Sequence, residues 1–219
     1  MFEVLNLEVA RKKFKLYVPS LRAEGNVVLL GRNGSGKSTL LKTLVGFIKP
    51  IRGRILLNGR EITRLPPSGR EIGYLPQEPV RFPFEPWKTI EFFAKKFRVD
   101  GKALVSELGL SHLLEKRELS QGENQMINLA VLMMKNPKLL LLDEPTASLD
   151  FINKLIFWNL LKNLRTDKIY VTHDPIEASL VADKIYMVAH GRVSGPYDNP
   201  LRNRVEAMLD EFNLYRFFQ

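Results

Sequence analysis

Apolar residues follow two distinct patterns along almost the whole chain. Short continuous apolar runs predict buried strands, and these runs are residues 27–30, 72–75, 139–142, 169–171 and 184–188. Stretches with apolar positions every three to four residues predict helices, and these stretches are residues 39–45, 87–118, 123–135 and 151–165. Strands that alternate with helices indicate a mostly parallel sheet that is covered by helices on both faces. The expected fold class is therefore α/β.

The remaining segments divide the chain further. Residues 2–30 alternate apolar and polar positions around a basic turn, which predicts an antiparallel β-hairpin ahead of the first buried strand. The prolines between residues 79 and 86 exclude regular structure there. The tail, about 200–219, is amphipathic and is expected to form a C-terminal helix. A length of 219 residues suits a single large domain over 1–219.

One glycine-rich segment carries a ligand-binding pattern. Residues 31–39 fit the P-loop pattern of Gly, four residues, Gly, Lys and Ser or Thr, between a predicted strand and a predicted helix. The glycines let backbone N–H groups close around phosphate oxygens at a helix N-terminus. Lys37 is expected to reach the β- and γ-phosphates of a nucleotide, and the Ser38 hydroxyl to bind Mg²⁺. The predicted nucleotide-binding residues are Gly31, Asn33, Gly34, Ser35, Gly36, Lys37, Ser38 and Thr39.

Two acidic residues follow the buried strand at 139–142. The carboxyl ends of such strands are the edge at which ligands bind. Asp143 is placed to hold Mg²⁺, directly or through water. Glu144 projects one residue further, where a carboxylate can accept a proton from an attacking water. The alternative is an Asp-Glu pair that only caps the next turn, but a P-loop in the same chain favours the chemical roles.

Composition limits the class of protein. A hydrophobic share of 45% with 26% charged residues is ordinary for a globular protein, and the absence of cysteine excludes disulfides and thiolate metal sites. No run approaches the ~20 apolar residues of a membrane span, and no secretory signal is evident, so a cytoplasmic protein is expected. The net charge of +9 is unevenly placed: residues 1–100 carry 19 Lys or Arg and 9 Asp or Glu, a net +10, whereas residues 101–219 carry 14 and 15, a net −1. This basic half suits a polyphosphate ligand, nucleic acid or an anionic membrane, although a solvated surface is the simplest explanation.

Further motifs appear in the order typical of one family. Residues 31–39 resemble its Walker A loop, and residues 139–144 resemble its Walker B strand with the catalytic glutamate. Gln77 resembles the Q-loop glutamine, Asp150 the D-loop aspartate and His173 the switch histidine. The segment with Ser120, Gln121, Gly122 and Glu123 resembles the family's signature motif. With six motifs in order over nearly its whole length, the chain resembles the nucleotide-binding subunit of ATP-binding-cassette (ABC) transporters.

The resemblance implies a mechanism. Two nucleotide-binding subunits close head to tail around two ATP molecules, so that Ser120 and the Gly122 backbone contact a γ-phosphate held by the partner subunit. Hydrolysis then weakens the closed pair, because ADP lacks those contacts. The implied catalytic residues are Glu144, His173 and Gln77. The implied Mg²⁺ ligands are Ser38, Gln77 and Asp143. Asp150 is implied to communicate across the dimer.

The resemblance also implies a fold and a set of partners. The fold would be a P-loop NTPase core with an N-terminal antiparallel β subdomain and a small helical lobe inserted at about 78–135. ATP and Mg²⁺ would be the cofactors. The partners would be a transmembrane permease and a second nucleotide-binding subunit, either a copy of this chain or a related one, at the inner face of the cell membrane. No nucleic acid partner is expected. Residues 65–74 resemble importer-type subunits.

The chain departs from the family pattern at several positions. Gln121 stands where the family usually has a glycine, and Glu123 stands where it has a glutamine. Met126 and Val131 occupy places where the family usually has arginines, so ion pairs inside the helical lobe are expected to differ. Ser120 and Gly122, which are expected to face phosphate, follow the pattern.

Two sets of aromatic residues have open interpretations. The family stacks adenine on an aromatic residue ahead of Walker A, and Phe14 is nearest to the expected place, with Tyr17 next. Burial in the strand core is the favoured interpretation for both. Phe82, Phe84 and Trp87 fit equally well a socket for a short helix of the permease or the core of the small helical lobe.

The expected function is that of an ATP-hydrolysing subunit that drives transport by ATP-dependent closure of a dimer against a separate permease. An ABC-type ATPase that acts on DNA or the ribosome is the alternative, and the basic first half favours it mildly. Against it, the chain has no long heptad insertion and only one cassette. A small-molecule phosphotransferase fits the P-loop but leaves the signature motif unexplained.

Overall fold

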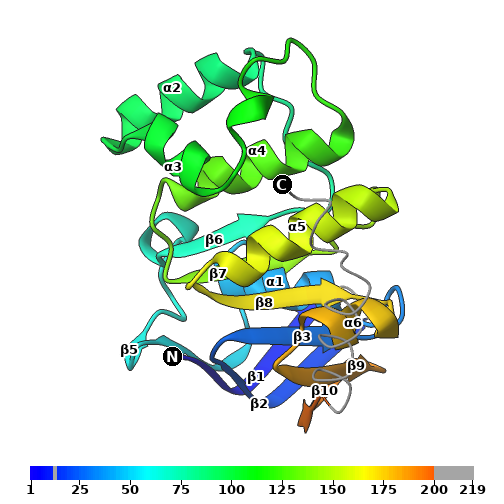
Figure 1. The fold of residues 1–219 in the computed structure, drawn as a ribbon. Helices are drawn as coiled ribbons and strands as arrows, with labels where there is room; N and C mark the ends of the chain where they lie inside the picture. The colour runs from blue at the N-terminus through cyan, green and yellow to red at the C-terminus, as the bar shows by residue number, and fades with distance from the viewer. Residues whose placement is uncertain (12–13, 200–219) are drawn as a thin grey trace.

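A ten-stranded sheet runs through the molecule, with helices on both of its faces (Figure 1). The computed structural model describes residues 1–11 and 14–199. The strands are β1 (Phe2–Arg11), β2 (Phe14–Ala23), β3 (Asn26–Leu30), β4 (Arg52–Leu57), β5 (Arg60–Glu61), β6 (Ile72–Leu75), β7 (Leu139–Asp143), β8 (Asp167–Thr172), β9 (Lys184–Ala189) and β10 (Arg192–Asp198). Their order across the sheet is β5-β4-β1-β2-β10-β9-β3-β8-β7-β6. The helices are α1 (Lys37–Val45), α2 (Pro86–Phe97), α3 (Gly101–Glu107), α4 (Gln121–Met133), α5 (Phe151–Asn163) and α6 (Pro175–Val181), with 3₁₀ turns η1 (Pro67–Gly69) and η2 (Ser111–Leu113).

One half of the sheet is parallel. Strands β6, β7, β8, β3 and β9 are parallel neighbours, and β7 is buried at every position, as its apolar sequence predicts. Parallel strands end at one edge, and the ladders end together there, with Leu30 opposite Thr172 and Asp143 opposite Val171. The segments that follow β3, β6, β7 and β8 therefore meet at this edge.

The other half is antiparallel except between β2 and β10, which pair parallel with Tyr17 opposite Arg192. The expected hairpin is confirmed: β1 and β2 pair along their whole length, from Phe2 opposite Ala23 to Arg11 opposite Phe14. Strand β4 adds to the outer side of β1, and the short β5 adds to β4. The expected mixture of a mainly parallel core with an N-terminal antiparallel part is therefore the observed fold.

Two apolar cores lie on opposite faces of the parallel strands, because side chains alternate along a strand. On β3, Val27 and Leu29 face the core that α1 shares with the antiparallel strands, whereas Val28 faces the core formed with α4, α5 and α6. Leu139 and Leu141 of β7 alternate with their neighbours in the same way. All five side chains are fully buried, so the sheet is fixed from both sides.

The helical subdomain lies at the top of Figure 1 and consists of α2, α3 and α4. The helical stretch predicted at 87–118 is divided into α2, α3 and η2. The cause is local, since Arg98 ends α2 in the left-handed region at φ 57° and the Asp100 side chain caps α3 by accepting from the Ala103 N–H at 3.0 Å.

Strand β10 and helix α6 are among the elements that were not predicted. Strand β10 pairs antiparallel with β9, but it is mostly exposed and contains Gly195 and Pro196, so its sequence carries no strand pattern. Helix α6 has only seven residues, although Asp174 before Pro175 is a regular helix start. The C-terminal helix predicted at about 200–219 lies outside the described residues.

Over residues 1–11 and 14–199, no helix is both long enough and apolar enough to cross a bilayer.

Candidate functional site

The phosphate-binding loop lies between β3 and α1. Gly34 and Gly36 have φ angles of 78° and 110°, a region that favours glycine. Gly36 is required for a second reason, because a Cβ atom there would lie 2.6 Å from the Phe14 ring. Helix α1 begins at the next residue, Lys37. Loop and helix N-terminus together form the arrangement that binds phosphate groups through backbone N–H.

Lys37 connects this loop to the acidic end of β7. Its side chain is buried, with 4% exposed. The Nζ atom donates hydrogen bonds to the carbonyls of Gly31 at 2.6 Å and Arg32 at 3.0 Å, and lies 3.5 Å from Oε1 of Glu144. The ammonium group is therefore held where it can contact phosphates gripped by the loop.

Asp143, the last residue of β7, accepts a hydrogen bond on each carboxylate oxygen. Ser38 donates to Oδ1 at 2.9 Å, and the Tyr74 hydroxyl donates to Oδ2 at 3.0 Å. Burial, and then the charge of Asp143, raises the pKa of Tyr74 well above its ordinary value, so the phenol stays a donor. Mg²⁺ in nucleotide sites takes one or two protein oxygens together with phosphates and waters, so Ser38 and Asp143 fit such an ion.

Glu144 and His173 form a pair at the ends of β7 and β8. Oε2 of Glu144 lies 3.2 Å from Nδ1 of His173. The backbone of Glu144 is in the left-handed region at φ 45°, and its N–H donates to the carbonyl of Val171 at 3.1 Å. A residue without glycine's freedom is costly in this conformation, and such residues cluster at functional sites. The turn directs the carboxylate of Glu144 toward Lys37 and His173.

These groups surround one cavity of about 580 Å³. Its lining residues are Arg11, Phe14, Asn33, Gly34, Gly36, Lys37, Ser38, Thr39, Gln77 and Glu144. The structure thus brings the predicted loop, Gln77 and Glu144 together. Asp143 and His173 join them through their bonds to Ser38 and Glu144. A volume of this size is typical of sites for small molecules and cofactors.

The two aromatic candidates for adenine differ in position. Phe14 lines the cavity and also packs against the core beneath it. Tyr17 is not among the described residues that line it; its hydroxyl donates to Oδ1 of Asn6 at 3.2 Å, and its ring lies 5.8 Å from the guanidinium of Arg192. Arg11, which the sequence did not single out, lines the cavity beside Phe14.

The predicted signature motif forms the N-terminus of α4. The Ser120 Oγ accepts from the N–H of Glu123 at 3.3 Å, and Oε2 of Glu123 accepts from the N–H of Ser120 at 2.9 Å, which is a capping box. Partial burial opposes ionisation of Glu123, yet Lys116 and the hydrogen bonds with Ser120 lower its pKa. Glutamate in place of glutamine therefore preserves the cap and adds a charge that is favourable at a helix N-terminus.

The predicted D-loop residue packs beside this helix start. Asp150 caps α5 by accepting from the backbone N–H of Asn153 at 2.9 Å and from its Nδ2 at 2.7 Å, and these bonds lower the pKa of Asp150. Gly122 lies so close to α5 that a Cβ there would be 3.1 Å from Leu149 and 3.2 Å from Asn153. Among the described residues that line the cavity, none belongs to the signature motif or is Asp150.

Tyr74 is a site residue that sequence reasoning missed. Its contact with Asp143 exists because β6 lies beside β7, with Tyr74 opposite Leu141 in the ladder. No local pattern marks this neighbourhood, since strand order is a property of the whole sheet.

Comparison with known proteins gives relatives of one kind. The sequence model described as ABC transporter matches residues 19–147. A molybdate/tungstate import ATP-binding protein of Methanocaldococcus jannaschii is 38% identical over 205 residues, which cover 88% of this chain and 69% of that protein. A protein of the same name from Archaeoglobus fulgidus is 36% identical, with 88% and 85% covered. A spermidine/putrescine import ATP-binding protein of Frankia alni is 35% identical, with 86% and 45% covered.

Solved structures agree on the fold. An ATP-binding subunit of an ABC transporter superposes with a TM-score of 0.76 at 22% identity, covering 98% of this chain and 94% of the other. A nucleotide-free ATP-binding cassette from an ABC transporter gives a TM-score of 0.78 at 20% identity, with 96% and 95% covered. Sequence and fold lead to the same assignment: the chain belongs to the ABC transporter family, as one of its ATP-binding subunits and an ATPase coupled to transport.

Proposed function

We propose that this chain is the ATP-hydrolysing subunit of an importer, and that it works against a separate membrane permease. The import names of its relatives and the importer-like segment at 65–74 support the direction. The archaeal relatives serve molybdate/tungstate and the Frankia alni relative serves spermidine/putrescine at similar identity. Because this subunit binds ATP rather than cargo, the cargo follows from the permease and from any receptor that works with it.

The chemical step is in-line attack of water on the γ-phosphate. Glu144 accepts the proton of the attacking water, and His173, hydrogen-bonded to Glu144, holds the geometry at the γ-phosphate. Lys37 and the loop N–H groups bind the phosphate oxygens. Mg²⁺, held by Ser38, Asp143 and Gln77, neutralises charge on the phosphates when bound. The observation that carries this proposal is that Lys37, Ser38, Gln77 and Glu144 line one cavity, with Asp143 bonded to Ser38 and His173 bonded to Glu144.

A second copy of the fold completes the site. The signature residues Ser120 and Gly122 lie at a capped helix N-terminus, which is a favourable place for a phosphate. This helix start is not part of the lining of the chain's own cavity. A head-to-tail dimer would bring the signature motif of one subunit to the ATP of the other. Asp150, packed beside the signature helix, would then lie at the subunit interface.

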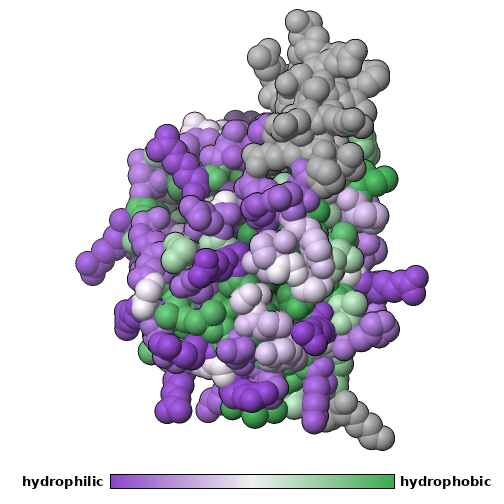
Figure 2. Space-filling model, turned by 90° about the horizontal axis from the view of Figure 1, so that it is seen from below, coloured by the Kyte–Doolittle hydropathy of each residue, from purple (hydrophilic) through white to green (hydrophobic). Residues whose placement is uncertain are grey.

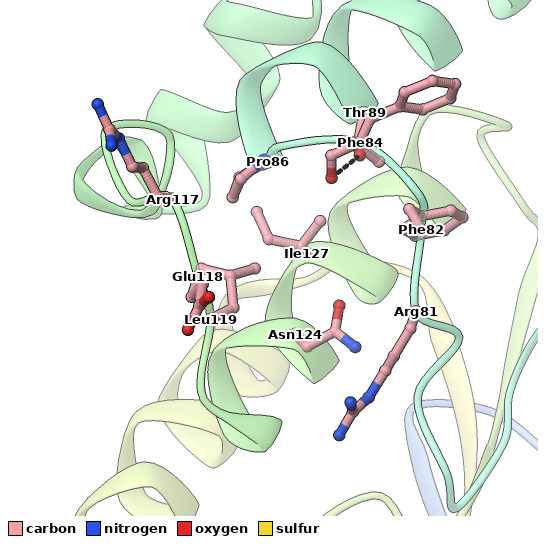
Figure 3. Close-up of a pocket in the computed structure, with 10 residues that line it drawn as sticks. All are labelled: Arg81, Phe82, Phe84, Pro86, Thr89, Arg117, Glu118, Leu119, Asn124 and Ile127. Carbon is pink, nitrogen blue, oxygen red and sulfur yellow. Dashed lines mark hydrogen bonds between the residues drawn. The ribbon is translucent and has the colours of Figure 1, made fainter.

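The permease is proposed to dock on the helical subdomain. A pocket of about 370 Å³ opens there between the segment that precedes α2 and the start of α4 (Figure 3). Phe82, Phe84 and Pro86 form one wall and Leu119 and Ile127 another, with charged and polar residues at the rim. Figure 2 shows the opposite end of the molecule, where β1, β2, β9 and β10 lie. Hydrophilic residues predominate on that surface, and apolar residues form only smaller patches between them.

Both interpretations of the lobe aromatics therefore apply, to different residues. Phe82 packs against Phe93 with ring centroids 5.3 Å apart, so it belongs to the lobe core. Phe84 and Trp87 are about half exposed, at 50% and 46%. These two are available to a permease helix.

Glu144→Gln tests the catalytic part of the proposal. The amide keeps the shape of the side chain but cannot accept a proton, so phosphate release should fall by roughly 10²–10⁴-fold while ATP affinity is retained. Glu107→Gln makes the same chemical change on exposed α3, away from the cavity, and should leave hydrolysis unchanged. Near-normal turnover of Glu144→Gln would remove Glu144 as the base.

A further inference from the structure

A buried carboxylate lies behind the proposed reacting pair. Glu177 of α6 is 5% exposed, although it is an acidic residue. Its Oε1 accepts hydrogen bonds from the Tyr170 hydroxyl at 2.5 Å, from the Trp158 Nε1 at 3.3 Å and from the hydroxyl of Thr146. Its Oε2 accepts from the hydroxyl of Thr172. These four donors are neutral groups, so the carboxylate is stabilised by a shell of hydroxyl and indole donors.

Two of these donors belong to the segments that carry the reacting groups. Thr146 lies two residues after Glu144, in the turn that begins at the left-handed Glu144. Thr172 lies directly before His173, and its Oγ1 also accepts from the N–H of Asp174 at 3.1 Å, directly after it. One carboxylate therefore fixes the backbone beside both members of the Glu144–His173 pair.

The other two donors come from the scaffold. Trp158 belongs to α5, and Tyr170 belongs to β8 and faces the core shared with α4 and α5. Burial, and then the charge of Glu177, raises the pKa of Tyr170 well above its ordinary value, so its hydroxyl remains a donor to the carboxylate. The carboxylate is thus tied on one side to rigid elements and on the other to the two catalytic turns.

Apolar side chains would fill this part of the core at lower cost, because burial of a carboxylate is unfavourable until hydrogen-bond partners compensate for the lost water. A geometric role explains its presence here. Reacting groups must be held within a fraction of an ångström of their working positions, and side chains behind them supply that constraint.

We propose that Glu177 is a positioning residue for hydrolysis: it holds the turn that carries Glu144 and the turn that carries His173 on one carboxylate. It contacts neither ATP nor the attacking water. The inference rests on the proposed catalytic roles of Glu144 and His173 and deepens them by naming what sets their separation of 3.2 Å.

Threonine-to-valine variants test it without removing the carboxylate. Thr146→Val and Thr172→Val each keep the side-chain shape and remove the hydrogen bond between a catalytic turn and Glu177. Thr146→Val also removes the contact with the Tyr170 hydroxyl, and Thr172→Val also removes the acceptor of the Asp174 N–H. Each should lower kcat by about tenfold, with KM changed less than about twofold, since displacement of reacting groups acts on the chemical step. Trp158→Phe removes a hydrogen bond from the scaffold side and is the matched control, with kcat near that of the unchanged protein.

The melting temperature of each Val variant and of Trp158→Phe is measured beside its kcat, so that a loss of activity can be separated from a loss of stability. If Glu177 only fills the core, the Val variants and Trp158→Phe will lower the melting temperature alike and leave kcat unchanged, which would overturn the proposal. Glu177→Gln should restore much of the kcat that Glu177→Ala loses, because the amide oxygen still accepts. In a His173→Ala background, Glu177→Ala should lower kcat by a smaller factor than it does alone, because one of the two turns that Glu177 holds no longer carries a reacting group; an undiminished additional loss would also overturn the proposal.

The outcome separates this inference from the proposed function. If Glu144→Gln abolishes hydrolysis but the Val variants do not reduce it, Glu177 is a core residue and the assigned chemistry stands. If Glu144→Gln itself is active, the proposed chemistry fails first.

Discussion

At the scale of single residues, Lys37 shows why the motif and the acidic pair have to be considered together. Its Nζ reaches the loop carbonyls of Gly31 and Arg32 and also lies 3.5 Å from Glu144. One ammonium group therefore links the place where phosphate is gripped to the place where water would be activated. Any phosphate held by Lys37 is brought within reach of the carboxylate.

Phe14 is the residue for which the structure changes the interpretation most. Phe14→Ala removes the ring that lines the cavity, and stacking on a base contributes about 1–3 kcal/mol, so ATP affinity should fall by roughly tenfold or more. Affinity for inorganic tripolyphosphate should be unchanged, because the ligand has no base. Isothermal titration with both ligands measures this.

Tyr17→Ala is the control for that experiment, since Tyr17 hydrogen-bonds to Asn6 and does not line the cavity. It should leave both affinities near those of the unchanged protein. An equal loss of ATP and tripolyphosphate binding in Phe14→Ala would contradict base stacking. It would mean that Phe14 acts by supporting the loop at Gly36.

Whether a site residue could be predicted from the sequence depends on how far away in the sequence its partners lie. Lys37 and Ser38 were predicted because one contiguous motif fixes their chemistry. Tyr74 was missed because its contact with Asp143 depends on which strands are neighbours. Glu177 was missed because two of its donors, Thr146 and Trp158, lie 31 and 19 residues away in the sequence. Phe14 lay between these cases, since its place in the sequence suggested a role but only the fold brings it to the loop.

At the scale of elements, α4 depends on its first turn. Glu123→Ala breaks the capping box, which should lower the free energy of unfolding by about 1 kcal/mol and loosen the helix start that carries Ser120. Glu123→Gln restores the residue usual in the family and should retain both the cap and the stability. Urea unfolding of the two variants decides between them; equal stability of Ala and Gln would show that the cap contributes nothing.

Docking of the permease on the helical subdomain can be tested at Phe84. Phe84→Arg places a charge in the pocket beside Phe82 and Pro86, so coupling to the permease should be reduced at least tenfold, as expected for a residue central to an interface. Basal hydrolysis by the isolated subunit should be unchanged, because Phe84 lies outside the ATP cavity. Ile51→Arg, at a position that is 65% exposed, should affect neither quantity. Retained binding of Phe84→Arg to the permease would contradict docking here.

Which elements could be predicted depends on where their stability comes from. Strands β3 and β7 were predicted because both faces are buried, which forces a continuous apolar run. Strand β10 was missed because backbone pairing with β9 holds it while its side chains stay exposed. The break between α2 and α3 was missed because it depends on one left-handed residue, Arg98, and one cap, Asp100.

At the scale of the whole molecule, the groups proposed for ATP hydrolysis and the predicted signature motif lie in different parts of the fold. The parallel half of the sheet ends at the edge that carries the phosphate loop, Asp143, Glu144 and His173, while α4 carries the signature motif from a separate subdomain. A single copy therefore carries one cavity lined by the phosphate loop and, away from it, the predicted signature motif at the start of α4. Two copies related head to tail would bring each motif to the cavity of the other copy.

Complementation between two damaged copies tests that geometry. In a Glu144→Gln background, which slows hydrolysis, ATP should drive the subunit from monomer to dimer. Adding Ser120→Arg blocks the signature motif, and adding Lys37→Ala instead weakens ATP binding, so neither double variant should dimerise alone. Light scattering with ATP and with ADP measures the mass in each case.

The mixture of the two double variants is the decisive sample. The Ser120→Arg copy still has an intact phosphate loop, and the Lys37→Ala copy still has an intact signature helix, so together they should form one good composite site. The expected species is a dimer with one ATP, because γ-phosphate contacts across the interface are what hold the copies together. If each copy enclosed its own ATP, the mixture would behave as the two variants do separately. Dimerisation of the mixture would therefore assign the signature motif of one copy to the ATP of the other.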